Sequence, residues 1–193
     1  MYRKIGLSNY KLEKGDLVIM ASYPKQDNEA KGFAMKFSAT EIPVAVFNLR
    51  KSKDEEDDVI RDSNLYLDYR ENIDIDYIEE QCHQVQNHRY FRVIIIDYNK
   101  EIKCINDNLG LRLKKLSQEL GAKIFLLCDL KESATINEYP TLEDINNQEL
   151  IEFADSIWLM DEEKGICILA KNAHGDVGIV EFNKTIKEET ETI

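Results

Sequence analysis

The chain has 193 residues, of which 43% are apolar and 32% charged, a composition typical of a globular domain with room for a hydrophobic core. Its 37 acidic and 25 basic side chains give a formal net charge of −12, which disfavours tight non-specific binding to a polyanion such as DNA. No apolar run reaches 18 residues and the N-terminus lacks the apolar stretch of a signal peptide, so no membrane contact is expected.

The first predicted strand, Leu17 to Ala21, runs into a polar loop and then into a helix expected from about Gly32. This is the layout of a phosphate-binding loop, whose motif G-x-x-x-x-G-K-[ST] supplies backbone N–H groups, a lysine charge and a hydroxyl for Mg²⁺. The residues found there are Ser22, Tyr23, Pro24, Lys25, Gln26, Asp27, Asn28 and Glu29. Every diagnostic position is changed, and Asp27 and Glu29 place carboxylates where phosphate oxygens would lie.

Seven further apolar runs are predicted as strands: Val44–Phe47, Leu65–Leu67, Val93–Ile96, Ile124–Cys128, Ser156–Met160, Ile166–Ala170 and Gly178–Phe182. The run Val93–Ile96 is apolar at four successive positions, as expected of a central strand covered on both faces. The last two strands are joined by the turn-rich segment Lys171–Asp176, which predicts an antiparallel hairpin.

Helical spacing appears between these strands. Apolar residues recur over 75–85 and, as leucines, over 109–120, where Gly121 is expected to end the helix. Thr141 is a plausible cap for a further helix running to about Phe153. The alternation predicts one α/β domain over 1–183, a mainly parallel sheet with helices on both faces, and a charged, flexible tail over 184–193.

Four cysteines are scattered along the chain without a C-x-x-C motif, and Cys128 and Cys167 lie inside apolar runs. We expect reduced, buried, structural thiols in a cytoplasmic protein. The three histidines, His83, His88 and His174, have no metal-ligand spacing, so structural or solvent roles are expected for them. Trp158 is expected to lie in the core.

Taken in chain order, the segments resemble the C-terminal, RecA-like motor domain of the replicative DNA helicase DnaB family. The resemblance rests on Gly15-Asp-Leu-Val-Ile, Phe33-Ala34, Pro43-Val-Ala-Val-Phe, Leu65-Tyr-Leu-Asp68, Ile94-Ile-Ile-Asp97-Tyr98, Leu116-Ser-Gln-Glu-Leu120 followed by Ile124-Phe-Leu-Leu, Pro140-Thr-Leu-Glu-Asp144, Ala154-Asp155, and Ile168-Leu-Ala-Lys171-Asn with Gly175 and Gly178. It spans about Gly6 to Phe182 and implies a P-loop NTPase fold of the RecA type.

The positions at which the family carries its chemistry differ in this chain. The phosphate-loop lysine and threonine fall near Asn28 and Glu29, and the catalytic glutamate falls in Asn48-Leu49-Arg50. The polar sensor is replaced by Asp129 and the arginine finger by Ala173. Asp97, at the Walker B position, and Lys171 remain.

Phosphoryl transfer depends on positioning and on stabilising developing charge, and here several of the required groups are missing together. We therefore expect a non-catalytic RecA-like module, with the degenerate loop Ser22, Pro24, Lys25, Asp27, Asn28 and Glu29 non-functional and no cofactor bound. The alternative is a DnaB-type, ATP-dependent helicase or ATPase with an atypical loop, which would use ATP and Mg²⁺. A different ligand at the same strand ends is a third reading.

Two residues, Asp97 and Lys171, each allow two interpretations. Asp97 is a weak candidate for holding a divalent cation, and the favoured alternative is a carboxylate that bonds a neighbouring loop. Lys171 is expected to be a surface charge rather than a phosphate sensor. The loops Asn99–Asp107 and Lys131–Glu138 are not notably basic, so DNA binding is expected to be weak or absent. The expected partner is a protein, either a helicase ring or another replication protein.

Overall fold

The computed structural model describes residues 3–6, 10–23, 42–48, 59–61, 64–68, 70, 74–88, 90–97, 108–131, 133, 138–161 and 163–181. Several sequence predictions lie outside these residues: the loop positions Pro24 to Glu29, the helix from about Gly32, Leu49 and Arg50, most of the loops 99–107 and 131–138, and the tail 184–193.

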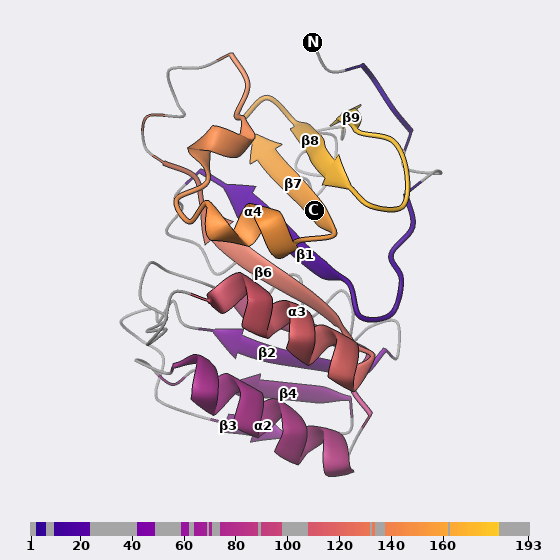
Figure 1. The fold of residues 1–193 in the computed structure, drawn as a ribbon, viewed down its shortest axis with the longest axis vertical. Helices are drawn as coiled ribbons and strands as arrows, with labels where there is room; N and C mark the ends of the chain where they lie inside the picture. Colours follow the sequence, from indigo (N-terminus) through magenta and orange to yellow (C-terminus); the bar gives the residue numbers. More distant parts are fainter. Residues whose placement is uncertain are drawn as a thin grey trace, which may run out of the picture.

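The described strands form one sheet with the order β3-β4-β2-β5-β6-β1-β7-β8-β9 (Figure 1). Their bounds are β1 Leu17–Ser22, β2 Val44–Asn48, β3 Val59–Arg61, β4 Leu65–Asp68, β5 Val93–Asp97, β6 Lys123–Asp129, β7 Ser156–Asp161, β8 Ile166–Asn172 and β9 Gly178–Glu181. Within this order, the strands β4, β2, β5, β6, β1 and β7 are parallel to one another. The predicted parallel sheet is therefore confirmed.

Two features of the sheet differ from the sequence prediction. The antiparallel end has three strands rather than a single hairpin, because β7 also pairs antiparallel with β8. The short strand β3 was not predicted. It follows the acidic block Asp54–Asp58 and pairs antiparallel with β4, with Ile60 opposite Leu67. These residues therefore form a strand because they pair with β4, and not because of a local sequence pattern.

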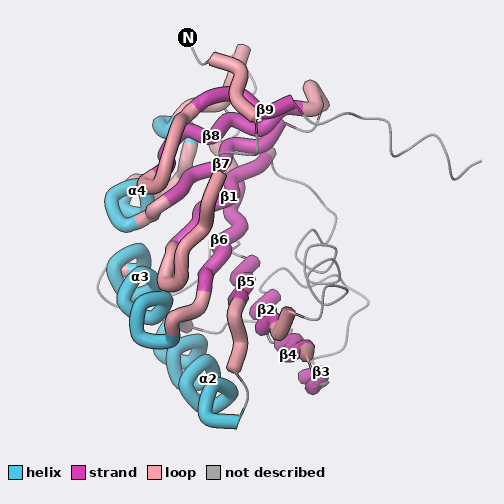
Figure 2. The backbone as a smooth tube through the Cα atoms, turned by 90° about the vertical axis from the view of Figure 1, so that its right-hand side faces the viewer, coloured by secondary structure: helices cyan, strands magenta, loops and turns pink. Residues whose placement is uncertain are grey.

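The described helices α2 (Ile75–His88), α3 (Leu109–Leu120) and α4 (Glu149–Phe153) lie on the same face of the sheet (Figure 2). The predicted leucine stripe of α3 is buried at all four positions. Gly121 ends α3 in the left-handed conformation at φ 60°, as the sequence predicts. In α2, Ile75, Ile78 and Cys82 are buried in the same way.

The single helix expected from Thr141 to Phe153 is wrong. A 3₁₀ turn, η3 (Leu142–Asp144), precedes the separate helix α4. The Asp144 carboxylate accepts hydrogen bonds from the Thr141 backbone N–H and hydroxyl, at 2.8 and 3.0 Å, and thereby closes the turn. Ile145 is then extended and bridges Leu130, beyond the end of β6, which takes it out of any helix.

The sheet is covered by apolar side chains on both faces. The larger buried cluster joins one face to α2, α3 and α4 and includes Ile78, Leu113 and Leu150. The second cluster lies on the opposite face and consists of Val18, Val44, Val46, Leu67, Val93, Ile95, Phe125 and Leu127. Strand β5 contributes to both clusters and is buried at all five residues, as expected for a central strand.

Three cysteines, Cys82, Cys128 and Cys167, are buried, as predicted, and Cys104 lies outside the described residues. Burial raises the pKa of Cys82 and raises that of Cys167 to about 12, so these two thiols stay protonated at neutral pH. Within the residues that the structure describes, no helix is long and apolar enough to span a membrane.

Candidate functional site

The candidate site is the carboxyl edge, which we define as the edge of the sheet where the parallel strands end. The residues that end these strands are Ser22 in β1, Asn48 in β2, Asp68 in β4, Asp97 in β5, Asp129 in β6 and Asp161 in β7. Ser22 pairs with Asp129, and Asp97 pairs with Asn48 on one side and Leu127 on the other. Open α/β sheets bind ligands at this edge, so two predicted site residues, Ser22 and Asp97, lie on the expected side, separated by β6.

The end of β1 is fixed where the phosphate-binding loop would begin. The Ser22 carbonyl accepts a 2.8 Å hydrogen bond from the Leu130 N–H, which extends the pairing of β1 with β6 beyond the strand. Tyr23 is partly buried against the larger core cluster. Burial, and then the negative charge of Asp161, raise the pKa of the Tyr23 hydroxyl. The first described residues of the loop therefore lie near carboxylates.

Asp97 is only 2% exposed at the end of β5. In the described part of the chain, no group of three or more His, Cys, Asp or Glu side chains is arranged to hold a metal ion. A cation at Asp97 stays a prediction.

Asp68, two strands away from β5, has a structural role. Its fully buried carboxylate accepts five hydrogen bonds: one each from the hydroxyls of Tyr66 and Tyr77, and three from Arg70 through its backbone N–H, Nε and Nη2. The guanidinium of Arg70 also lies 4.4 Å from the centre of the Tyr77 ring. The charge of Asp68 is therefore matched within the protein.

Other cations beside the carboxyl edge are also bonded to the protein itself. Lys164 Nζ lies 3.0 Å from the Asp161 carboxylate and donates to the Glu138 carbonyl. Lys131, which follows β6, donates its ammonium to the Glu143 carbonyl. A phosphate would have to compete with the Asp161 carboxylate for Lys164.

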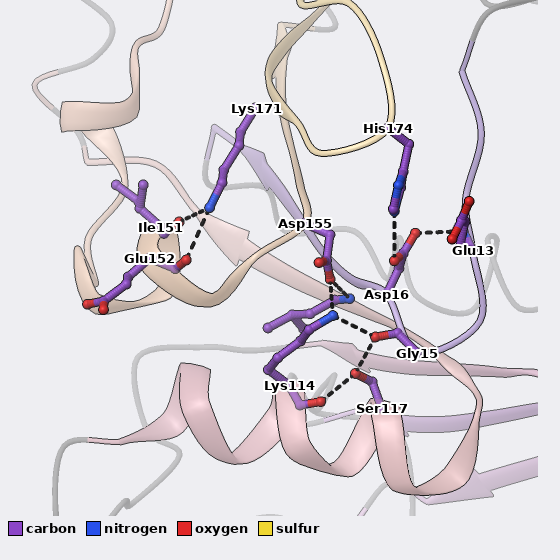
Figure 3. Close-up of polar contacts among 11 residues, drawn as sticks. Glu13, Gly15, Asp16, Lys114, Ser117, Ile151, Glu152, Asp155, Lys171 and His174 are labelled. Carbon is purple, nitrogen blue, oxygen red and sulfur yellow. Dashed lines mark hydrogen bonds and ion pairs between the residues drawn. The ribbon is translucent and has the colours of Figure 1, made fainter.

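The opposite, amino edge of the sheet carries a dense polar network around the start of β1 (Figure 3). Gly15 adopts a positive φ of 79°, and its carbonyl accepts 2.8 Å hydrogen bonds from Lys114 Nζ and Ser117 Oγ of α3. Asp155, just before β7, accepts from the Leu17 N–H at 2.7 Å and from Lys114 Nζ at 2.6 Å. One ion pair thus ties β1 to α3 and β7.

The turn between β8 and β9 joins the same network. His174 Nε2 lies 3.0 Å from Asp16 Oδ1, and the Glu13 N–H donates to the other carboxylate oxygen at 2.6 Å. The hydrogen bond to Asp16 raises the pKa of His174, against the smaller opposing effect of burial. The structural role predicted for His174 is confirmed.

Lys171, which the sequence predicts to be a surface charge, is partly buried and is bonded within its own chain. Its ammonium donates to the carbonyls of Ile151 and Glu152 in α4, at 2.8 and 3.1 Å (Figure 3). A β-bulge causes this arrangement. The register between β7 and β8 shifts after Ile157, so that Lys171 pairs with Ile157 on the helix-covered face. A cation at a helix C-terminus is favourable, and the bond holds Lys171 within its own subunit.

Ala173, which stands at the arginine-finger position, lies in the turn at the amino edge. Its backbone N–H donates to the Asp155 carbonyl at 2.8 Å. The sequence reading missed the roles of Asp16, Lys114 and Ser117. Their long-range partners lie 41 to 158 residues away in the chain, so no local spacing could have signalled them.

No protein-family model matches the chain, and no curated protein does. Among solved structures, the chain is similar to one described as "The Structure Of A DnaB-Like Replicative Helicase And Its Interactions With Primase". The TM-score is 0.71 at 20% sequence identity, and the match covers 89% of this chain and 56% of the helicase chain. This chain thus spans just over half the length of that helicase. The fold is therefore that of a RecA-like domain of a DnaB-like helicase, which confirms the predicted architecture.

The variant Asp155→Asn should lower the free energy of unfolding by about 2 kcal/mol, because it leaves the Lys114 ammonium, only 19% exposed, without its carboxylate. Urea unfolding measures the effect. Glu152→Gln, an exposed carboxylate three residues away, is the control and should change stability little. Adding Lys114→Met to Asp155→Asn should recover part of the loss, and strictly additive losses would show that the two residues are not coupled.

The contribution of His174 to stability should depend on pH. Because folding raises the pKa of His174, its pair with Asp16 stabilises the fold fully below the unfolded-chain pKa of about 6.5, and the effect is lost as pH rises through the folded-state pKa. His174→Gln should therefore cost about 1 kcal/mol or less at pH 5.5 and less still at pH 9. Chemical unfolding of both proteins at the two pH values provides the measurement. A difference that grows toward pH 9 would contradict the assignment.

Proposed function

We propose that this chain is a non-catalytic RecA-like domain that acts in DNA replication as a protein-binding or regulatory module. One observation carries the proposal: the segment from Ser22 to Glu29 has no glycine, and Asn28 and Glu29 stand where the phosphate-binding motif has its lysine and its hydroxyl residue. The carboxylates Asp27 and Glu29 in that segment would repel phosphate oxygens.

The described carboxyl edge supports this proposal. Four of its strands end in aspartate, and Asp144 and Asp161 lie near Tyr23. The cations Arg70, Lys131 and Lys164 are bonded to groups of the protein. An edge of this charge would attract a triphosphate poorly unless Mg²⁺ or the loop supplied compensation.

The hairpin supports the same conclusion. In the related helicases an arginine at this hairpin acts on the nucleotide of a neighbouring subunit, as the resemblance implies. Here Ala173 occupies that place, and Lys171 is bound to α4 of its own chain. The hairpin would therefore supply no charge to a neighbour.

A protein partner fits these properties better than DNA does. The net charge of −12 opposes contact with a polyanion. The helicase of similar fold is described with its interactions with primase, and this protein partner of a similar structure supports a protein contact for this chain. We propose a replicative helicase ring as the partner, with this domain offering one subunit face to it.

The alternative is an ATPase with an atypical loop. One observation favours it: Asp97 is buried at the end of β5. In the family that the chain resembles, this position carries the Walker B carboxylate. Under this alternative, Asp97 would hold Mg²⁺ and the loop would bind ATP through groups other than the usual ones.

Thermal unfolding with and without Mg·ATP separates the two functions. A working site at 100 times its Kd would add about 2.7 kcal/mol of stability, or about 5–10 °C in Tm for a chain of this size. We expect no shift at millimolar Mg·ATP. A rise in Tm at sub-millimolar ATP that Asp97→Asn abolishes, and that Glu152→Gln at an exposed residue of α4 leaves in place, would establish the ATPase alternative.

Size-exclusion chromatography with the replicative helicase of the same cell tests the partner. The chain should co-elute with the helicase ring and lower its rate of DNA unwinding as its concentration rises, while primase run separately provides a second candidate partner. Independent elution from the helicase at concentrations of about 50 μM, well above the Kd of a specific complex, together with unchanged unwinding, would contradict the proposal.

A further inference from the structure

A pocket of about 230 Å³ lies at the antiparallel end of the sheet, away from the carboxyl-edge site. We call it the β7–β9 pocket. The described residues that line it are Arg3, Lys4, Ile5, Gly6, Tyr10, Trp158, Cys167, Leu169, Asn172, Asp176 and Val180. Its floor comes from the sheet and its wall from the N-terminal segment, which runs alongside β9 (Figure 1).

The floor is an apolar patch on the face of the sheet that the described helices do not cover. Trp158 pairs with Leu169, and Cys167 pairs with Val180, so the four side chains lie together on one face. Ile157, which precedes Trp158 in the chain, belongs to the core cluster on the helix side of the sheet. Because successive strand residues point to opposite faces, Trp158 and the rest of the patch lie on the other face. Trp158 is thus half-buried at the rim of the second core cluster rather than fully enclosed in it.

The wall depends on a close backbone approach. Residues 3–5 run parallel to β9: the Ile5 N–H donates to the Ile179 carbonyl at 2.9 Å and the Ile179 N–H donates to the Arg3 carbonyl at 2.8 Å. A Cβ at Gly178 would collide with the Arg3 carbonyl oxygen and lie 2.8 Å from the Ile5 side chain. Glycine at 178 is therefore what lets the wall stand against the floor.

Two aromatic rings form a corner of the pocket. Tyr10 and Trp158 meet edge to face, with ring centres 4.7 Å apart at 81°, and Trp158 Nε1 donates to the Tyr10 hydroxyl at 3.0 Å. Beside them, the Ser156 hydroxyl is fully buried and lies close to the Tyr10 hydroxyl. Ser156 pairs across the sheet with Asn172, a lining residue, so polar side chains adjoin the aromatic corner.

The charges at the mouth cancel. Arg3 pairs with Asp176 at 2.6 Å and Lys4 with Glu181 at 2.7 Å, and all four side chains are more than half exposed. A charged ligand would have to compete with these pairs, whereas an uncharged one would leave them in place.

We propose that the β7–β9 pocket binds an uncharged, bicyclic aromatic molecule that stacks in the Tyr10–Trp158 corner. Small-molecule sites are mostly apolar with a few polar groups, and aromatic pairs favour edge-to-face and offset arrangements. An apolar cavity of about 150 Å³ accommodates benzene, so a volume of about 230 Å³ suits a fused two-ring system of the size of indole or a purine base. This site is independent of the function proposed for the carboxyl edge.

The test uses the sole tryptophan of the chain. Trp158 gives one indole N–H signal in a proton–nitrogen correlation spectrum of the ¹⁵N-labelled protein, and benzimidazole is an uncharged two-ring probe at neutral pH. We expect the signal to shift saturably, with a Kd below about 1 mM. A carboxylated benzimidazole should bind more weakly. Absence of a saturable shift up to the solubility of the probe would overturn the proposal, and tighter binding of the acid would overturn the uncharged class.

Two variants remove the pocket in different ways. Leu169→Phe fills the floor and Gly178→Ala displaces the wall, and each should weaken binding at least about tenfold. Val177→Ala, at an exposed residue beside Gly178, is the control and should bind as the wild type does. Thermal unfolding confirms that each variant folds, and either folded variant is sufficient to decide. An unchanged Kd in a folded variant would show that the probe binds elsewhere.

Discussion

The structure depends on how the amino end of β1 is held. The backbone of Gly15 and Leu17 is bonded to the partly buried ion pair of Lys114 and Asp155, so a helix and two neighbouring strands are fixed to one short turn. β1 lies between β6 and β7, and this anchor holds the start of β1 beside the start of β7. The two strands therefore begin from one fixed point, from which they run in register to the carboxyl edge.

The amino and carboxyl edges of the parallel strands differ in how their charged side chains are paired. At the amino edge, Lys114, Asp155, Asp16 and His174 find partners of opposite charge inside the chain. The carboxyl edge is rich in aspartates, and several of its nearby cations are already bonded to the protein. The domain shares its fold with a DnaB-like helicase, whereas its sequence between Ser22 and Glu29 departs from the phosphate-binding motif. That contrast is the basis of the proposed role in binding.

Much of the fold could be predicted because its signals are local. The leucine spacing of α3 with Gly121 after it, and the unbroken apolar run of β5, each follow from residues next to one another in the chain. The failures have long-range causes. The helix expected from Thr141 is broken because Ile145 pairs with Leu130, and the direction of Lys171 is set by a bulge against β7. At the site, the residues of the loop could be compared directly with the phosphate-binding motif, whereas the long-range contacts of the amino-edge network join groups 41 to 158 positions apart.

The N-terminal residues 3–5 have a consequence beyond the pocket that they help to form. They occupy the N–H and the carbonyl of Ile179 in β9, the last strand in the sheet order, and place the charged side chains of Arg3 and Lys4 along it. Without them, β9 would offer a bare row of hydrogen-bonding groups to any extended peptide, including the same strand of another molecule. This short segment therefore protects the sheet against edge-to-edge pairing between molecules. We expect its loss to lower solubility more than it lowers the stability of the fold.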